Sequence, residues 1–145
     1  MIVFNNHDHG DAIARAAGCN FNPRCDIAIT RVAGDELLGG VIYQNYTHES
    51  ISIHVASFDK RAATRELLWV IFHYPFVQLG VKRIFGQVPE TNTKALEFDL
   101  ALGFKILTKV DGVFPDGGVI VLVLEKADCR WLNFKPKTLR AGQEM

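Results

Sequence analysis

Residues 50–78 constrain the fold most, because they join an alternating strand to an apolar helix through a short polar turn. Apolar residues alternate with small or polar ones over residues 51–56, which predicts a strand with one buried face. Residues 63–78 are apolar nearly all round and predict a helix that packs on a sheet and is covered on other sides. Pro75 is expected to kink or end this helix, because it lacks a backbone N–H.

The turn between this strand and helix is a potential anion-binding site. The first amides of a helix have no intrahelical acceptor, and the helix dipole adds partial positive charge there. Lys60, Arg61 and Arg65 lie in or beside the turn, and Ala62 and Ala63 are small enough for a phosphate to approach the backbone. Phosphate is therefore the expected ligand, although an ordinary structural junction between a strand and a helix has the same pattern.

Length and composition indicate one domain. The chain has 145 residues, of which 48% are hydrophobic, and its formal net charge is zero, so no overall field attracts nucleic acid or a membrane. No apolar run approaches the ~20 residues of a membrane span, and residues 1–9 do not resemble a signal peptide. Three cysteines without C-x-x-C spacing fit a reducing compartment. We expect a soluble, cytoplasmic protein without a membrane partner.

The predicted order of elements is strand, helix, three antiparallel strands, helix, strand, helix and two strands. The predicted strands cover residues 2–4, 27–32, 36–44, 50–56, 83–88, 104–110 and 119–125. The predicted helices cover residues 11–17, 63–78 and 92–102. We expect residues 1–127 to form the domain.

Residues 128–145 are expected to form a C-terminal extension. Its Trp131 and Phe134 are predicted to pack on the body or on a second subunit, and together with the apolar final strand they make a homodimer possible. A nucleic-acid partner is not expected, because the basic residues of the extension are too scattered to follow a phosphate backbone. These basic residues are Arg130, Lys135, Lys137 and Arg140.

A metal site is not expected. His7, His9, Cys19 and Cys25 carry groups that bind zinc, but their spacing matches no standard zinc finger. The simpler interpretation is that the cysteines are small buried apolar groups and the histidines are polar surface residues.

Three stretches resemble the GNAT superfamily of acyl-CoA-dependent N-acyltransferases: the strand ELLGGVIYQ at 36–44, the strand–turn–helix core, and NTKALEFDLALGF at 92–104. In that superfamily the last stretch commonly reads N-x-x-A-x-x-x-Y-x-x-x-G-F. The resemblance covers residues 28–124, and residues 69–83 look most like small phage or prophage members. It implies an α/β (α+β) fold with a mixed, mostly antiparallel central sheet flanked by helices and splayed between its fourth and fifth strands.

The resemblance also implies a cofactor, acetyl-CoA or another acyl-CoA. Its pantetheine would enter the opening between the splayed strands, and its pyrophosphate would bind the turn whose family pattern is Q/R-x-x-G-x-G/A, here residues 59–64. Asn92 matches a family asparagine that contacts the cofactor. The implied cofactor-binding residues are His54, Val55, Ala56, Lys60, Arg61, Ala62, Ala63, Thr64, Arg65 and Asn92.

Several residues depart from the family pattern. Asp59 stands where Gln or Arg is usual and would repel a pyrophosphate unless it turns outward. Ala62 replaces the first glycine, and Thr64 replaces the second small residue but offers a hydroxyl. Asp99 occupies the position of the family tyrosine that protonates the leaving thiolate.

The implied chemistry is direct attack of an amine on the thioester, with the oxyanion stabilised by strand N–H groups. His54 and Glu49 are the candidate bases, although His54 could equally be a packed sheet residue. Asp99 is a candidate acid if burial raises its pKa. Tyr43 and Tyr46 are predicted to line the acceptor pocket or merely to cover the sheet edge.

The sequence therefore predicts an N-acetyltransferase that transfers an acyl group to a primary amine of a small molecule or protein. The alternative is a catalytically degenerate GNAT-fold module with a binding or structural role, since the phosphate turn and the general acid are both altered. A nucleotide-binding α/β domain of another kind is disfavoured by the antiparallel strand order. Residues 20–26 and 111–118 are the loops expected to border the acceptor.

Overall fold

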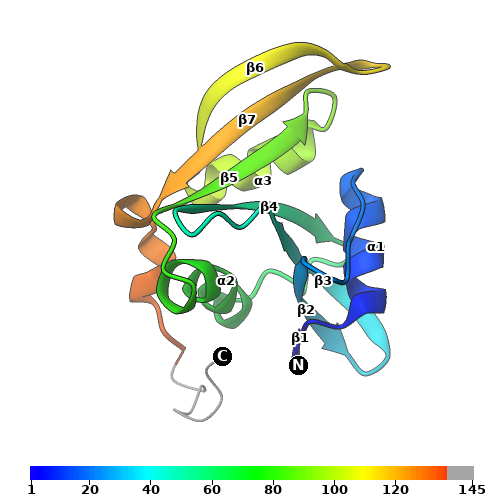
Figure 1. The fold of residues 1–145 in the computed structure, drawn as a ribbon. Helices are drawn as coiled ribbons and strands as arrows, with labels where there is room; N and C mark the ends of the chain where they lie inside the picture. The colour runs from blue at the N-terminus through cyan, green and yellow to red at the C-terminus, as the bar shows by residue number, and fades with distance from the viewer. Residues whose placement is uncertain (137–145) are drawn as a thin grey trace.

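The computed structural model describes residues 1–136, which contain seven strands and three α-helices (Figure 1). The strands are β1 (Ile2–Phe4), β2 (Ile27–Ala33), β3 (Glu36–Gln44), β4 (Ser50–Ser57), β5 (Arg83–Pro89), β6 (Lys105–Phe114) and β7 (Gly117–Glu125). The helices are α1 (His7–Ala17), α2 (Arg65–His73) and α3 (Thr93–Leu102). A π-helical turn, Tyr74–Gln78, follows α2, and two 3₁₀ helices, Lys126–Asp128 and Arg130–Asn133, follow β7.

The seven strands form one mixed sheet in the order β1-β2-β3-β4-β5-β7-β6. Every neighbouring pair is antiparallel except β4 and β5, which run parallel. The predicted fold class and the predicted order of elements are therefore confirmed. A parallel pair needs a crossover, and α2 with its π-helical turn supplies it.

The parallel strands β4 and β5 separate part of the way along their length. Their pairing starts at Ser50 with Arg83 and ends at Ile53 with Gly86, although both strands continue beyond this point. Because the strands diverge there, the sheet opens between its fourth and fifth strands, as the family resemblance implied.

Alternation along β2, β3 and β4 places two cores on opposite faces of the sheet. One face packs against α1, and the other packs against α2 and is the larger core. The α1 core contains Ile13, Ala14, Phe21, Ala28 and Ile42. The larger core includes Ile29, Val41, Ile51, Ile53, Leu68, Phe72, Phe76, Ile84, Phe104 and Leu122, and so joins both halves of the sheet.

The helix predicted for residues 63–78 is in fact two elements. α2 begins after Thr64, whose Oγ1 accepts a hydrogen bond from the Leu67 amide at 3.1 Å. Pro75 cannot donate a backbone hydrogen bond, and the chain widens into the π-helical turn, closed by the Leu79 amide on the Tyr74 carbonyl at 3.0 Å. The prediction that Pro75 would kink or end the helix is confirmed, since α2 ends at His73.

Two predicted boundaries were wrong. α1 begins four residues earlier than residue 11, because Asn6 accepts a hydrogen bond from the His9 amide and caps it. β6 continues to Phe114 through an irregularity after Val110, so residues 111–118 form the end of a β-hairpin rather than a loop. The strand accommodates Asp111 and Gly112 as a bulge.

The start of the C-terminal extension packs on the body. Trp131 and Leu132 contact the larger core, and Lys137 and Arg140 lie outside the described residues. Within residues 1–136, no helix has both the length and the apolar character needed to cross a bilayer.

Candidate active site

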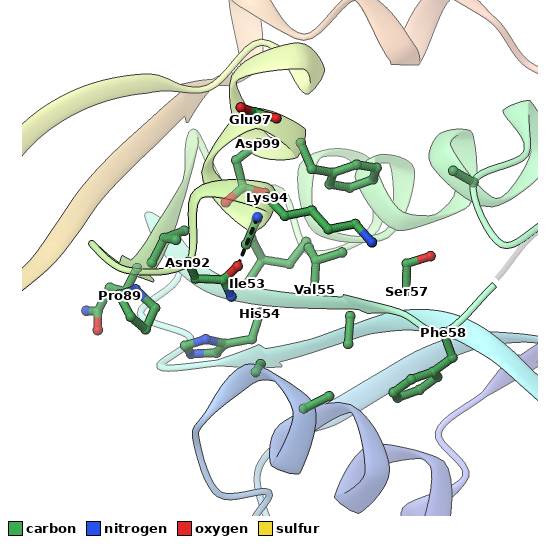
Figure 2. Close-up of a pocket in the computed structure, with 18 of the residues that line it drawn as sticks. Ile53, His54, Val55, Ser57, Phe58, Pro89, Asn92, Lys94, Glu97 and Asp99 are labelled. Carbon is green, nitrogen blue, oxygen red and sulfur yellow. Dashed lines mark hydrogen bonds between the residues drawn. The ribbon is translucent and has the colours of Figure 1, made fainter. Parts of the chain in front are cut away.

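A cleft of about 700 Å³ occupies the opening between β4 and β5 (Figure 2). This volume is within the range of small-molecule sites, roughly 300–1,000 Å³. Residues 53–57 and the following turn form one wall, and the end of β5 and α3 form the other; Ala16 and Ala17 of α1 border it as well. Since β4 and β5 are not paired here, the edges of both strands that face the opening have no strand partner across it.

The turn after β4 is held by an ion-pair network of Asp59, Arg61 and Glu36, of which only Asp59 lines the cleft. The Asp59 carboxylate accepts hydrogen bonds from the backbone amide of Arg61 at 2.8 Å and from its Nε at 3.0 Å. These contacts lower the pKa of Asp59 to about 2. Arg61 Nη2 also lies 2.8 Å from Glu36 Oε2. The negative charge of Asp59 is therefore neutralised within the turn, and Arg61 is turned toward carboxylates rather than toward the cleft.

Lys60 and Ala63 are the turn residues that line the cleft beside Asp59. Within residues 1–136, the backbone amides of Lys60 and Ala63 have no hydrogen-bond acceptor. Ala62 instead is buried against Gly39 of β3, where a Cβ would lie 2.9 Å from the Ala62 methyl. The turn is thus tightly packed on one side and presents two free N–H donors near the start of α2.

Thr64 and Arg65, the last predicted phosphate-binding residues, are engaged elsewhere. The Thr64 hydroxyl caps α2, and the Arg65 guanidinium lies 5.5 Å from the centre of the Phe134 ring. Both remain at the N-terminus of α2, but neither side chain lines the cleft.

The α3 wall presents Asn92, Ala95 and Asp99, spaced so that they share one helix face. Asn92 Oδ1 caps the helix by accepting a hydrogen bond from the Ala95 amide at 3.1 Å, shown dashed in Figure 2. Its amide nitrogen remains available to donate to a ligand. The family resemblance implied a cofactor contact for this asparagine, and its position as the helix cap permits that role as well.

Asp99 is a buried carboxyl in the wall of the cleft (Figure 2). It is only 8% exposed, and its carboxyl group has no hydrogen-bond donor or ion-pair partner within residues 1–136. Removal from water is the cause that raises the pKa of Asp99 to about 7. A substantial fraction of Asp99 is therefore protonated near neutral pH and can donate a proton.

His54 faces the cleft from β4, on the strand face that packs toward α1. Burial lowers the pKa of His54, and the charge of Asp26 opposes this only in part. His54 is therefore mainly neutral at pH 7 and can accept a proton. His54 and Asp99 come from opposite walls, so the cleft holds a candidate base and a candidate acid with pKa values shifted toward those roles.

Three predicted site residues lie outside this cleft. Glu49 precedes β4, and its Oε2 lies 2.9 Å from Lys82 Nζ, which lowers the pKa of Glu49. Tyr43 is 1% exposed and donates its hydroxyl to the Ile71 carbonyl at 2.6 Å. Tyr46 contacts His48 and borders, with Tyr43, a separate hollow of about 90 Å³. None of the three lines the cleft between β4 and β5.

Other lining residues were not predicted from the sequence. Lys94 points into the cleft region from the first turn of α3, and Phe58 lines the cleft from the turn (Figure 2). Phe98 adds apolar surface. Lys94 could have been found from the motif, because it lies two residues after the predicted cofactor contact Asn92. No sequence pattern indicated that Phe58 would line the cleft, because its position depends on how the turn folds back on β3.

The two histidines near the N-terminus, which carry groups able to bind zinc, have other contacts. His9 Nδ1 lies 2.9 Å from Thr30 Oγ1, and the His7 ring lies against Phe21. Across the part of the chain that the structure describes, no three His, Cys, Asp or Glu side chains gather as a metal site would require.

Several solved structures that are similar to this chain are acetyltransferases. The chain is similar to a GNAT-family acetyltransferase from Bacillus anthracis, with 10% identity, a TM-score of 0.63, and coverage of 87% of this chain and 94% of that one. It is also similar to mutant forms of the spermidine/spermine N-acetyltransferase SpeG from Vibrio cholerae, with 16% identity, a TM-score of 0.66, and coverage of 94% and 100%.

A structure of the Vibrio cholerae spermidine N-acetyltransferase in complex with CoA and spermine has 20% identity and a TM-score of 0.60, with coverage of 75% of this chain and 69% of that one. No protein-family model and no curated protein matches the sequence. Residues 1–136 therefore have the fold of the GNAT acetyltransferases, which confirms the fold implied by the resemblance.

Proposed function

We propose that this protein is an acyl-CoA-dependent N-acyltransferase that transfers an acetyl or other acyl group to a primary amine. The observation that carries the proposal is the cleft between β4 and β5: the strands stop pairing at Ile53 and Gly86, and the opening is lined by polar groups from both walls. An ordinary structural splay would be filled by side chains, whereas this one retains about 700 Å³.

The charges at the cleft suit a polyanionic cofactor such as CoA. Lys60 and Lys94 line it, and within residues 1–136 neither has a carboxylate partner. By contrast, Arg61, Lys82 and Lys109, away from the lining, are all in ion pairs. The free amides of the turn add donors at the start of α2, where an anion is favoured. These residues would hold the phosphates, and Asn92 would contact the pantetheine arm.

The cofactor, when bound, supplies an activated thioester carbonyl. His54 would accept the proton that the amine loses as its nitrogen bonds to that carbonyl carbon, and free N–H groups of β4 would stabilise the oxyanion. Asp99, partly protonated near neutral pH, would donate a proton to the departing sulfur, so that free thiol and amide would result. Proton exchange with water then restores both residues.

The acceptor is proposed to be a primary amine of a small molecule or of a protein. The Vibrio cholerae neighbours act on spermidine and spermine, which supports a small-molecule amine. A homodimer is also proposed, because β6 is an exposed edge strand with Ile106, Leu107 and Val110 each about half exposed.

Acetyl-CoA binding tests this proposal before any acceptor is known. We expect 1 mM acetyl-CoA to raise the melting temperature, with a stabilisation near RT ln(1 + [L]/Kd), about 2.7 kcal/mol if the ligand is at a hundred times Kd. Release of thiol from acetyl-CoA would then be measured with spermidine and with a lysine-containing peptide. No thermal shift at millimolar acetyl-CoA would reject the proposal, and a shift without thiol release from any amine would favour the non-catalytic module.

A further inference from the structure

Residues 129–135 contact both α3, which lines the cleft, and α2, which begins just after the turn at its mouth. On the α3 side, Arg130 Nη2 donates to the Ala101 carbonyl at 2.5 Å, and Trp131 Nε1 donates to the Leu102 carbonyl at 2.9 Å. These are carbonyls of the last turn of α3, which have no partner within the helix. The guanidinium of Arg130 also complements the negative end of the helix dipole.

The same segment reaches the first turns of α2. The Phe134 ring lies under the Arg65 guanidinium at 5.5 Å, and Lys135 Nζ lies 5.9 Å from the centre of the Trp69 ring. Trp131 contacts Phe134 edge-on at 6.3 Å, and the Arg130 guanidinium lies 4.4 Å from the Trp131 ring centre. A continuous series of contacts therefore runs from α3 to α2.

The helix turn that this segment holds is the one that carries Asp99. Ala101 and Leu102 follow Asp99 by two and three residues, and the Phe104 amide donates to the Asp99 backbone carbonyl at 3.2 Å. The side chain of Asp99 stays buried only while this turn remains against the sheet near Gly86. Loosening of the turn would admit water to the carboxyl.

We propose that residues 129–135 act as a clasp that fixes α3 relative to α2 and so keeps the Asp99 side chain shielded within the cleft. Arg130 and Trp131 are positioning residues, since they contact the helix and not the cleft. The consequence for catalysis rests on the proposed acyl transfer, whereas the shielding of Asp99 does not. Other charged or titratable groups at the cleft are Lys94 and Glu97 of α3, His54 of β4, and Lys60 and Asp59 of the turn.

The test compares the wild type with the double variant Arg130→Ala/Trp131→Phe. The phenylalanine retains an aromatic ring against the core but lacks the Nε1–H donor. Asp128→Asn is the matched control, because this neighbouring residue is exposed and makes only a long 3.9 Å contact with Lys105. Melting curves confirm that all three proteins are folded at the temperature of measurement.

The first readout needs no ligand. We expect the double variant to exchange the amides of Gly103 and Phe104 about tenfold faster, as the capped turn frays. We also expect the pKa of Asp99, followed by carbon-detected NMR, to fall by about 1 pH unit because water reaches the carboxyl. Unchanged exchange rates together with an unchanged Asp99 pKa would overturn the clasp.

The second readout uses acetyl-CoA and the amine found active in the thiol assay. We expect kcat of the double variant to fall about tenfold with a smaller change in KM, and the decline of activity at alkaline pH to begin about 1 pH unit lower. An unchanged kcat together with faster amide exchange would overturn the proposed effect of the clasp on catalysis. If the wild type does not bind acetyl-CoA, the proposed function fails, and amide exchange and the Asp99 pKa alone still decide the clasp.

Discussion

The turn after β4 and the α3 wall of the cleft use their polar side chains in different ways. In the turn, the side chains of Asp59, Arg61 and Thr64 are all occupied with one another, with Glu36 or with a helix cap. On the α3 side, the Asp99 carboxyl is buried and has no partner within residues 1–136. The Asn92 side chain caps the helix with its oxygen and leaves its amide nitrogen free to donate. A buried carboxyl without a partner costs stability, so its presence in a cleft wall is better explained by chemistry than by folding.

The residues that depart from the GNAT sequence pattern also differ between the turn and the α3 wall. The departures at Asp59 and Thr64 are absorbed by structural contacts, so they do not place an uncompensated negative charge at the mouth of the cleft. The departure at Asp99 is of another kind, because it puts at the position of the family tyrosine a carboxyl whose pKa burial has raised. The α3 wall should therefore be far more sensitive to substitution than the turn.

The largest effect is expected for Asp99→Asn. An amide cannot donate a proton to the leaving sulfur as an acid does, so kcat should fall about a hundredfold. The wild type should lose activity as the pH rises above about 7, where Asp99 deprotonates. The variant should not show this alkaline decline in its pH–activity profile. Thiol release measured from pH 5.5 to 9 tests both points. Glu49→Gln is the control carboxylate and should retain kcat within about twofold, since Glu49 is paired with Lys82 outside the cleft.

Asp99→Asn should also change stability in a pH-dependent way. The folded-state pKa of Asp99, about 7, lies above the ordinary value of 3.8, so stability falls as the pH rises between these values. Above pH 7 the wild type bears the full cost of the buried charge, which the variant avoids. The variant should therefore be more stable at pH 8 by about 2 kcal/mol, and this advantage should shrink at pH 5. Urea unfolding at both pH values measures the difference in the free energy of unfolding between variant and wild type. An equal difference at pH 5 and pH 8 would contradict the prediction.

The cations of the two walls should have an intermediate effect. Lys60→Ala/Lys94→Ala removes the two lysines of the lining, and the Kd for acetyl-CoA should rise about tenfold and depend less on salt. Isothermal titration at two ionic strengths measures both changes. Lys82→Ala removes one exposed cation that is paired away from the cleft, and binding should be unaffected. An equal loss in both proteins would mean that the effect is one of net charge.

The smallest effect is expected in the turn itself. Arg61→Ala breaks exposed ion pairs with Asp59 and Glu36, and such pairs contribute little. The melting temperature should move by no more than about 2 °C, and the Kd for acetyl-CoA by less than about threefold. Calorimetry and titration measure these quantities. A tenfold loss of affinity would show that Arg61 leaves its carboxylates to contact phosphate, and the contrast between the walls would then disappear.

Local patterns in the sequence were sufficient for most elements of the fold. Alternation over residues 51–56 identified β4, because this signal depends only on neighbouring residues. The separation of β4 from β5 was implied by family resemblance alone. No pattern within either strand indicates where the pairing stops, since that depends on the packing of the helices.

The site was predicted only in part, for the same reason. His54, Asn92 and Asp99 do line the cleft, because each lies in or next to a strand or helix whose direction the motif indicates, and their roles stay predictions. Tyr43 was misplaced because its hydroxyl finds the Ile71 carbonyl, 28 residues away, and is buried there. Contacts at such separation cannot be read from spacing, and the same holds for the packing of Trp131 on α3.

The four residue pairs that join β4 to β5, from Ser50 and Arg83 to Ile53 and Gly86, have a thermal consequence. So few backbone bonds link the two halves of the sheet that their cohesion depends on the apolar core shared by α2 and the strands on either side. Apolar burial weakens on cooling, whereas hydrogen bonds within each half do not depend on it in the same way. Low temperature should therefore part the two halves at this seam before either half unfolds.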